Sequence, residues 1–276
     1  MRLGASFIAF SGLELLKPAL LNVREHAVWI NVVYQTVSHT GVPAPGYLQD
    51  LLSDLKREGL ADRWILFQPT ARATTPDVFQ SFQRMKLELG REDCRQAGCT
   101  HVTLRACDEF YFPDQFRWAL GESAGLDAAY VASVDYVRLP LIRHREISSL
   151  CLPFVHRAEL PLGEARLPFR VDPARVVGGA RDLKLLPSHR VVMHHMSRVR
   201  FDQEEVDRKY ESHSWSYAKS HLLLEKAAER EELDPSRYLW MERDPFGILD
   251  YWEKEFRSYK HCEGELPALK MGEFDG

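Results

Sequence analysis

Apolar and polar positions alternate in blocks along the first half of the chain. Short runs rich in β-branched and aromatic residues, typical of buried strands, are separated by stretches with apolar residues at helical spacing. The predicted strands are Leu3–Phe10, Val28–Tyr34, Trp64–Phe67 and Thr100–Cys107. The predicted helices are Leu13–Val23, where Pro18 is placed to kink the helix, Tyr47–Glu58, closed by Gly59, and Asp77–Ala97, closed by Gly98. This β-α-β-α-β-α-β order predicts an α/β fold with a mostly parallel, doubly wound sheet flanked by helices.

The second half of the chain has a less regular pattern. Further strands are predicted at Ala128–Leu139 (antiparallel or at an edge), Leu150–His156, Leu167–Val171 and Val191–His195, with Pro- and Gly-rich loops between them. From Phe201 the pattern turns helical and charged, at Asp202–Arg208, Ser216–Glu232 and Gly247–Tyr259. We therefore expect a ligand-binding and catalytic domain over residues 1–200. Residues 201–276 are expected to form a helical extension packed on it, frayed over its last dozen residues.

Composition narrows the class of protein. The 276 residues are 45% hydrophobic and 28% charged, with a net charge of −4 and no basic block, so an extended nucleic-acid interface is not expected. Five cysteines without a CxxC pair argue against a disulfide framework or zinc ribbon and suit a reducing cytosol. The sequence contains neither a long apolar run nor a signal-peptide pattern at Met1, which predicts a soluble cytoplasmic protein without an integral membrane segment.

The first chemical signal is the pair Asp108-Glu109, directly after the fourth predicted strand. In open α/β sheets ligands bind beyond the carboxyl ends of the strands, which predicts that these carboxylates project into a binding crevice. The alternative is that they favour the start of a helix beginning at Pro113, because acids are stabilised at helix N-termini.

A second signal is the tandem His194-His195 at the end of an apolar run. Successive side chains of a strand face opposite ways, so one of the two is expected to share a site with Asp108. A carboxylate and an imidazole together suit Mn²⁺ or Mg²⁺ with open positions for phosphate oxygens. The alternative places one histidine in the core and the other at the surface. On the long helix, Lys86 is positioned to reach a phosphate, whereas its other basic residues fit a solvated face (Arg84, Arg91 and Arg95).

Several short motifs occur in an order and spacing that resemble a known family. They are Leu3-Gly4-Ala5-Ser6, Val32-Val33-Tyr34-Gln35 with Ser38 and Gly41, Lys86 with Gly90, Ala97-Gly98-Cys99-Thr100-His101, Asp108-Glu109-Phe110-Tyr111, Val171-Asp172-Pro173, and Met193-His194-His195-Met196-Ser197 with Val199-Arg200. Together they resemble the nucleotide-sugar glycosyltransferases of the GT-A fold, in a family-2-like group found in bacteria and large viruses. The resemblance covers most of the first 200 residues.

The resemblance implies transfer of a hexosyl or deoxyhexosyl unit from a UDP-, GDP- or dTDP-sugar to a hydroxyl of a glycan or glycoconjugate, as in polysaccharide biosynthesis. It places the nucleotide at the ends of the first two strands, at Ala5, Ser6, Tyr34 and Gln35. Three further residues are expected to line the donor site: Lys86, Ala106 and Cys107. It also implies a divalent cation, Mn²⁺ or Mg²⁺, that joins the diphosphate to an Asp-x-Asp motif. The family's usual stretch is Asp-Thr-Asp-Glu-Phe-Tyr. Here Ala106 replaces the first aspartate, leaving Asp108 as the main carboxylate ligand with His194 or His195 as its partner.

On the acceptor side, an inverting transferase needs a general base, and Glu109 and Asp172 are the candidates. Asp172 precedes Pro173, so it is also a candidate turn initiator. Trp215 and Tyr217 are candidates for a sugar-stacking edge, or for packing against the core. The acceptor, such as a capsule, lipopolysaccharide or glycoprotein glycan, also allows peripheral contact with a membrane.

Two rival functional classes remain. Loss of the first motif aspartate at Ala106 suits a nucleotide-sugar-binding homologue with impaired catalysis or one that works without metal. A metal-dependent phosphoester hydrolase also needs Asp, Glu and His at strand ends. The first three predicted strands end without carboxylates, which disfavours a two-metal hydrolase.

Overall fold

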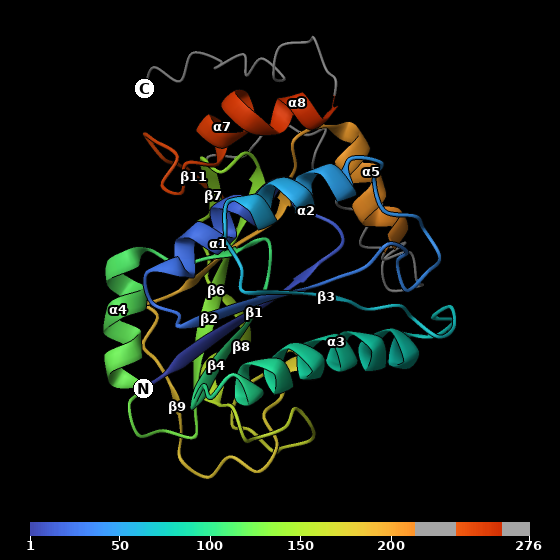
Figure 1. Cartoon of the computed structure of the whole chain (residues 1–276). Helices are drawn as coiled ribbons and strands as arrows, with labels where there is room; N and C mark the ends of the chain where they lie inside the picture. Colours follow the sequence, from blue (N-terminus) through green and yellow to red (C-terminus); the bar gives the residue numbers. More distant parts are fainter. Residues whose placement is uncertain (213–235, 261–276) are drawn as a thin grey trace.

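The computed structural model describes residues 1–212 and 236–260 of the chain (Figure 1). The elements of the first half are β1 (Leu3–Ala9), η1 (Leu13–Leu15), α1 (Leu16–Arg24), β2 (Trp29–Tyr34), α2 (Leu48–Arg57), β3 (Arg63–Leu66), α3 (Pro76–Gln96) and β4 (His101–Ala106). Those of the second half are β5 (Glu109–Phe110), α4 (Pro113–Glu122), β6 (Ala128–Arg138), β7 (Ile142–His144), β8 (Ser148–Arg157), η2 (Pro173–Arg175), β9 (Leu183–Leu185), β10 (Met193–Val199), α5 (Gln203–Ser212), β11 (Tyr238–Trp240), α7 (Ile248–Tyr251), the π-helical turn η3 (Trp252–Phe256) and α8 (Arg257–Lys260).

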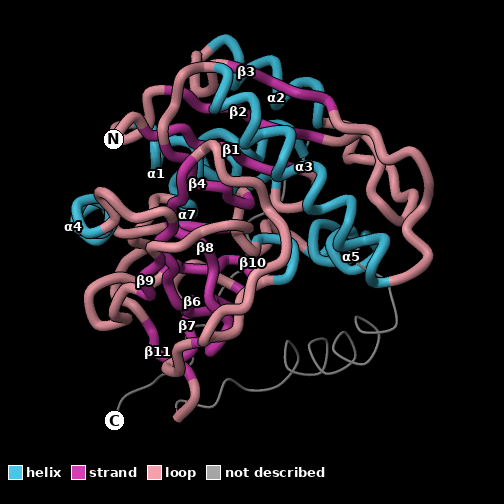
Figure 2. The backbone as a smooth tube through the Cα atoms, turned by 90° about the horizontal axis from the view of Figure 1, so that it is seen from below, coloured by secondary structure: helices cyan, strands magenta, loops and turns pink. Residues whose placement is uncertain are grey.

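The strands form one mixed sheet in the order β11-β7-β6-β8-β4-β1-β2-β3. Strands β3, β2, β1 and β4 run parallel to one another, whereas β8 lies between β4 and β6 and is antiparallel to both. Strand β10 pairs parallel with β6 and antiparallel with the short β5, which places it beside the end of β4. The expected α/β class, a mostly parallel sheet flanked by helices, is confirmed, with the parallel strands in the N-terminal part of a mixed sheet (Figure 2).

Helices cover both faces of the parallel part of the sheet (Figure 1). Helices α1 and α2 lie on one face, and the C-terminal elements α7 and α8 lie above them in the same view. Helix α3 lies on the opposite face, where it contacts β1, β2 and β4. The buried leucines of α2, predicted from their helical spacing, pack into the core on the first face (Leu48, Leu51, Leu52 and Leu55).

Local sequence signals explain where the helices begin and end. Thr75 caps α3, with its hydroxyl accepting a hydrogen bond from the Val78 amide, and Pro76 occupies the first turn. Gly59 and Gly98 adopt left-handed φ values of 67° and 79° just after α2 and α3. The expected kink at Pro18 is wrong, because a 3-10 turn precedes α1 and leaves Pro18 in its first turn, where a backbone N–H has no helical partner to lose.

Two of the strands predicted in the second half differ from the structure. Leu167–Val171 is wrong as a strand: apart from a bridge between Val171 and Cys151, the segment is irregular. The strand predicted at Ala128–Leu139 is antiparallel to β8, as expected, but it lies inside the sheet. Its partners β8, β9 and β10 come from later parts of the chain, so its central position was not visible in its own pattern.

The described part of the C-terminal extension is joined to the main body by a strand and by a buried cluster. Strand β11 pairs with β7, and Trp252 and Phe256 are buried in the core with α1 and α2. The indole nitrogen of Trp252 donates a hydrogen bond to the Glu14 carbonyl oxygen at 2.8 Å. The helix predicted at Ser216–Glu232, the candidates Trp215 and Tyr217, and the last dozen residues lie outside the described residues.

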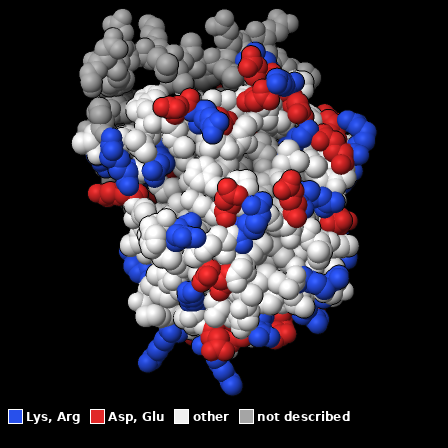
Figure 3. Space-filling model, turned by 90° about the vertical axis from the view of Figure 1, so that its left-hand side faces the viewer, with Lys and Arg blue, Asp and Glu red and all other residues white. Residues whose placement is uncertain are grey.

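The surface is of mixed charge on the face that Figure 3 shows, where basic and acidic side chains are interspersed. Within residues 1–212 and 236–260, no helix is both long enough and apolar enough to cross a membrane.

Candidate functional site

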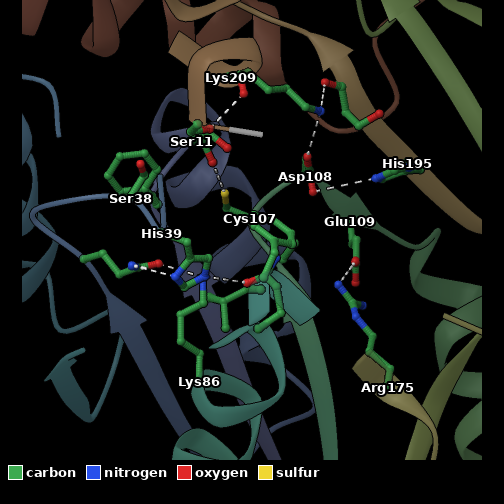
Figure 4. A pocket seen from close by; sticks show the side chains of 18 residues that line it. Ser11, Ser38, His39, Lys86, Cys107, Asp108, Glu109, Arg175, His195 and Lys209 are labelled. Atoms are coloured by element: carbon green, nitrogen blue, oxygen red, sulfur yellow. Dashed lines mark hydrogen bonds and ion pairs between the residues drawn. The ribbon is translucent and has the colours of Figure 1, made fainter. Parts of the chain in front are cut away.

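A cavity of about 320 Å³ opens where β1, β2 and β4 end (Figure 4). This is the side of an α/β sheet on which ligands bind, because the loops that follow the strands diverge there. The lining residues come from the end of β1 (Ile8, Phe10, Ser11), the loop after β2 (Gln35, Ser38, His39), α3 (Phe79, Gln83, Lys86), the end of β4 and start of β5 (Ala106, Cys107, Asp108, Glu109), and later segments (Arg175, His195, Ser197, Lys209, Ser212).

Asp108 is a buried carboxylate surrounded by basic groups. Its Oδ2 lies 3.3 Å from Arg200 Nη2 and 3.9 Å from Lys209 Nζ, and its Oδ1 lies 4.0 Å from His195 Nε2. Burial by itself raises the pKa of Asp108, but His195, Lys209 and Arg200 outweigh burial and hold this pKa below its ordinary value. Asp108 is therefore an anion inside the cavity. The alternative that Asp108 and Glu109 cap the following helix is wrong, because Phe112 occupies the N-cap of α4.

His195 faces Asp108 with one ring nitrogen, and its other ring nitrogen contacts a second carboxylate. It lies opposite Asp135 in the β6–β10 register, and its Nδ1 is 2.8 Å from Asp135 Oδ1. Burial lowers the pKa of His195, but the hydrogen bond to Asp135 and the charge of Asp108 more than compensate, so the pKa is raised. This arrangement leaves Nε2 directed toward Asp108, as Figure 4 shows.

The Asp108–His195 pair fits a divalent cation that shares its coordination with a substrate. A metal-bound histidine usually has its other ring nitrogen held by a carboxylate, as Asp135 holds His195 here. Among the described residues, no three His, Cys, Asp or Glu side chains group closely enough to hold a metal ion by themselves. Mg²⁺ and Mn²⁺ sites built on one or two protein ligands are completed by water and phosphate oxygens.

His194 lies on the other side of β10 and does not line the cavity. Its Nδ1 is 3.0 Å from the Tyr136 hydroxyl, and its ring packs against Phe112 and Phe246. Burial lowers the pKa of His194 to about 3, so the ring is neutral in the folded protein. Of the two histidines considered for the metal, His195 is the one that the fold brings to Asp108.

Glu109 and Asp172 meet at one guanidinium. Arg175 Nη2 lies 2.6 Å from Glu109 Oε1, and Arg175 Nε lies 3.4 Å from Asp172 Oδ2. Burial lowers the pKa of Arg175, but its two carboxylate partners raise it overall, so the guanidinium is charged. Glu109 lines the cavity, whereas Asp172 accepts a hydrogen bond from the Ala174 amide and caps η2. The turn-initiating role expected for Asp172 is therefore present in the structure.

Lys86 enters the cavity from α3. Its Nζ donates a hydrogen bond to Gln35 Oε1 at 2.7 Å, and burial lowers its pKa to about 7. Beside it, the His39 ring stacks on Phe82 with 5.3 Å between centroids. Lys86 and Gln35, both expected at the donor site, are thus brought together beside the rings of His39 and Phe79, which line the cavity and which the strand pattern did not reveal.

Of the remaining donor-site candidates, two line the cavity and three do not. Ala106 and Cys107 line the cavity, and the Cys107 thiol donates to the Ser11 carbonyl oxygen. Ser6 and Ala5 lie in the middle of β1, Ser6 under α3 and Ala5 in the core on the opposite face of the sheet, and Tyr34 ends β2; none of the three lines the cavity. Ile8, Phe10 and Ser11 occupy the corresponding cavity positions, because the carboxyl end of β1 lies several residues beyond the Leu3-Gly4-Ala5-Ser6 motif.

Three basic residues of the site were missed. Arg175 and Lys209 line the cavity, and Arg200 holds Asp108. Arg200 is part of the Val199-Arg200 motif, and Arg175 follows Asp172 by one turn, so both had a local signal. Lys209 lies on a charged amphipathic helix, where a solvated lysine is the ordinary expectation.

Comparison with known proteins gives neighbours in structure and none in sequence. No protein-family model matches the chain, and no curated protein matches it. Among solved structures, S. aureus TarS 1–349 is similar over 96% of this chain and 76% of its own, with 10% identity and a TM-score of 0.42. TarS 1–349 in complex with UDP-GlcNAc is similar over 94% of this chain and 73% of its own, with 10% identity and a TM-score of 0.41. Mannose-1-phosphate geranyltransferase from Thermus thermophilus is similar over 95% of this chain and 63% of its own, with 13% identity and a TM-score of 0.31.

Likenesses of this degree do not assign a reaction.

Proposed function

We propose that the protein is a glycosyltransferase of the GT-A, family-2-like type, which moves a sugar from a nucleoside diphosphate-sugar to a glycan or glycoconjugate hydroxyl in the cytoplasm. The observation that carries this proposal is the excess of basic over acidic groups in the cavity at the strand ends. The acids lining it are Asp108 and Glu109, against five basic side chains (His39, Lys86, Arg175, His195 and Lys209). Such a cavity suits a compact polyanion, and a diphosphate is the polyanion that a nucleotide-sugar presents.

Two parts of the site have separate roles toward the donor. Asp108 and His195 would hold Mn²⁺ or Mg²⁺, which when bound neutralises charge on the leaving diphosphate. Lys86 and Gln35, next to the rings of His39 and Phe79, bind the nucleotide part of the donor. Because His195 carries a raised pKa and must be neutral to bind a metal, metal affinity should increase with pH.

Glu109 is the carboxylate proposed to receive the proton of the acceptor hydroxyl. It lines the cavity, whereas Asp172 does not. Its contact with Arg175 at 2.6 Å fixes the direction of the carboxylate. The transferred unit is proposed to be a hexosyl or deoxyhexosyl group from a UDP-, GDP- or dTDP-sugar.

The first test is a thermal-shift screen of UDP, GDP, dTDP and their sugars, with and without Mn²⁺. A ligand that binds the folded state alone raises the melting temperature by mass action. We expect at least one nucleoside diphosphate to raise it, and the increase to be larger with Mn²⁺.

The second test is Asp108→Asn, assayed with the radiolabelled form of the donor that the screen selects. We expect turnover to fall by about a hundredfold or more, because the anionic carboxylate that would hold the cation facing the diphosphate is lost. The control is Asp114→Asn on α4, whose side chain is 94% exposed. Full activity of Asp108→Asn, or full activity in EDTA, would contradict the metal role.

Ala106 supports one second candidate, a nucleotide-sugar-binding protein without turnover. It lines the cavity at the position of the family's first aspartate, so one expected metal ligand is replaced by a methyl group. Binding of a nucleotide-sugar without loss of its labelled sugar would favour this candidate. Release of phosphate from a nucleoside diphosphate without sugar transfer would instead favour a hydrolase.

A further inference from the structure

Helix α5 carries a basic side chain into the cavity from a segment well separated in sequence from the strand ends. Lys209 Nζ donates a hydrogen bond to the Ser197 carbonyl oxygen and lies 3.9 Å from Asp108 Oδ2. Figure 4 shows it directed toward Asp108 from the opposite side to Lys86 and Arg175. A phosphate group bound near Asp108 would therefore meet an ammonium group that belongs to α5.

The position of α5 is fixed by contacts with the loop after β2. Thr40 Oγ1 donates to the Glu211 carbonyl oxygen at 3.1 Å, and Arg208 Nη1 donates to the Pro43 carbonyl oxygen at 3.2 Å. The Tyr47 hydroxyl donates to Glu205 Oε1 at 2.8 Å. These contacts hold α5 over the same loop that supplies Ser38 and His39 to the cavity.

The buried part of this attachment is an ion pair with the C-terminal helix α8. Lys260 Nζ lies 2.9 Å from Glu205 Oε1, 2.9 Å from Glu204 Oε2 and 3.2 Å from Asp202 Oδ2. The Lys260 side chain is 4% exposed and that of Glu205 is 1% exposed. A buried pair of this kind contributes little net stability but strongly disfavours any arrangement that separates the two charges, since each is then left uncompensated.

Resting on the proposed function, we propose that Lys209 binds the diphosphate and that Lys260 is a positioning residue which, through Glu205, holds α5 and Lys209 in place. The C-terminal extension is then part of the donor site, although α8 itself contributes no lining residue. Lys209 and Glu205 are one helical turn apart on α5, so a shift of the turn that carries Glu205 is transmitted to Lys209. Contacts with α8, on the side of α5 away from the cavity, therefore hold the helix in position.

The test is a double-mutant cycle with inorganic pyrophosphate as the probe, in magnesium chloride, with binding measured by calorimetry. Lys209→Met should weaken pyrophosphate binding by about 10- to 100-fold, the range for loss of a charge-assisted hydrogen bond. Lys260→Met should weaken it by about 3- to 10-fold, because Lys209 remains but is no longer held in place. In the Lys209→Met background, Lys260→Met should cause no further loss, since its effect passes through Lys209.

Glu205→Gln provides a second route to the same measurement, should Lys260→Met fold poorly, and it should show the same non-additivity with Lys209→Met. The matched control is Lys254→Met, a lysine of the same C-terminal segment whose side chain is 68% exposed and pairs with Asp250. It should leave pyrophosphate affinity unchanged. Thermal unfolding of each variant separates a loss of affinity from a loss of folded protein.

Three results would overturn the inference. They are wild-type affinity in Lys260→Met and Glu205→Gln, additive losses in the double variants, and absence of pyrophosphate binding by the wild-type protein. The proposed function is judged separately, by transfer of labelled sugar. If labelled sugar is transferred but the losses of pyrophosphate affinity are additive, the proposed function stands and the role of Lys260 does not. If the losses are non-additive as expected but no sugar is transferred, the anion site stands and the proposed function does not.

Discussion

At the scale of single residues, two adjacent histidines on β10 have opposite environments. His195 faces Asp108 across 4.0 Å and is held by Asp135, whereas His194 is enclosed by Tyr136, Phe112 and Phe246. The alternation of side chains along a strand produces this difference, so the two residues form a matched pair for mutation. The same alternation predicts that only one of them contributes to donor binding.

His195→Gln should weaken Mn²⁺-dependent nucleotide binding by about tenfold or more, because changes at a metal ligand, or at the group that orients it, have effects of this size. His194→Gln should leave that affinity close to wild type, which calorimetry with the selected nucleoside diphosphate measures. An equal loss in both variants would contradict the assignment of His195 alone to the cavity.

His194→Gln should instead change the pH dependence of stability. The folded-state pKa of His194 is lowered from 6.5 to about 3, so the unfolded chain binds a proton in this range that the folded protein does not. Its contribution to stability is therefore complete above pH 6.5 and is lost as the pH falls toward 3. Between pH 7 and 5 the loss is about 2 kcal/mol for wild type. Urea unfolding at several pH values should show a flatter profile for His194→Gln.

At the scale of elements, the site depends on close packing of α3 against β1 and β2. Gly90 allows this approach, because a Cβ atom at this position would lie 1.8 Å from Ser6 Oγ and 3.0 Å from Asn31 Oδ1. The same packing places Lys86, one turn earlier on α3, under Gln35 at the end of β2. Ser6 therefore affects the cavity through the position of α3, since it does not itself line the cavity.

Gly90→Ala should destabilise the protein by about 1–3 kcal/mol, the usual effect of overpacking a close contact. The control is Gly121→Ala near the end of α4, where an added Cβ meets no atom within 4 Å. It should be neutral or stabilising by about 0.5–1 kcal/mol, because alanine favours the helix. Thermal and urea unfolding of both variants measure the difference, and equal stabilities would show that α3 shifts freely on the sheet.

At the scale of the whole molecule, the described C-terminal elements share the core of the sheet domain. Trp252 and Phe256 are buried among residues of α1 and α2, and Trp252 is hydrogen-bonded to the Glu14 carbonyl oxygen. Strand β11 extends the sheet at β7. The division into a domain of residues 1–200 and an extension of residues 201–276 stays a prediction about the chain, and these contacts predict that the two parts unfold together.

Trp252→Ala should lower stability by about 3–5 kcal/mol, as expected for removal of a buried aromatic side chain. Unfolding followed by fluorescence and by circular dichroism should remain one coincident transition. Trp118→Ala on α4 is the control, because this half-buried tryptophan packs at the edge of the same core and should cost less. A separate early transition in Trp252→Ala would show that the C-terminal elements unfold independently.

The sequence by itself determined most of the elements in the parallel half of the sheet. Strands β1 to β4 and helices α2 and α3 lie within one residue of their predicted ends, because periodicity and the glycines at 59 and 98 act locally. It also determined that Asp108 and Glu109 follow β4 and that one histidine of the tandem pair faces them. These conclusions need only the alternation of a strand and the placement of strand ends.

The tertiary structure decided which basic groups complete the site. Arg200 and Asp108 are 92 residues apart in sequence, and Lys209 reaches the same carboxylate from a helix whose own pattern predicts a solvated face. Likewise, Glu109 meets Arg175 only because the loop before η2 returns to the end of β4. Such pairs depend on long-range packing, which no local pattern of apolar and polar positions encodes. The strand ends were therefore readable from the sequence, whereas the charges gathered around them were set by the fold.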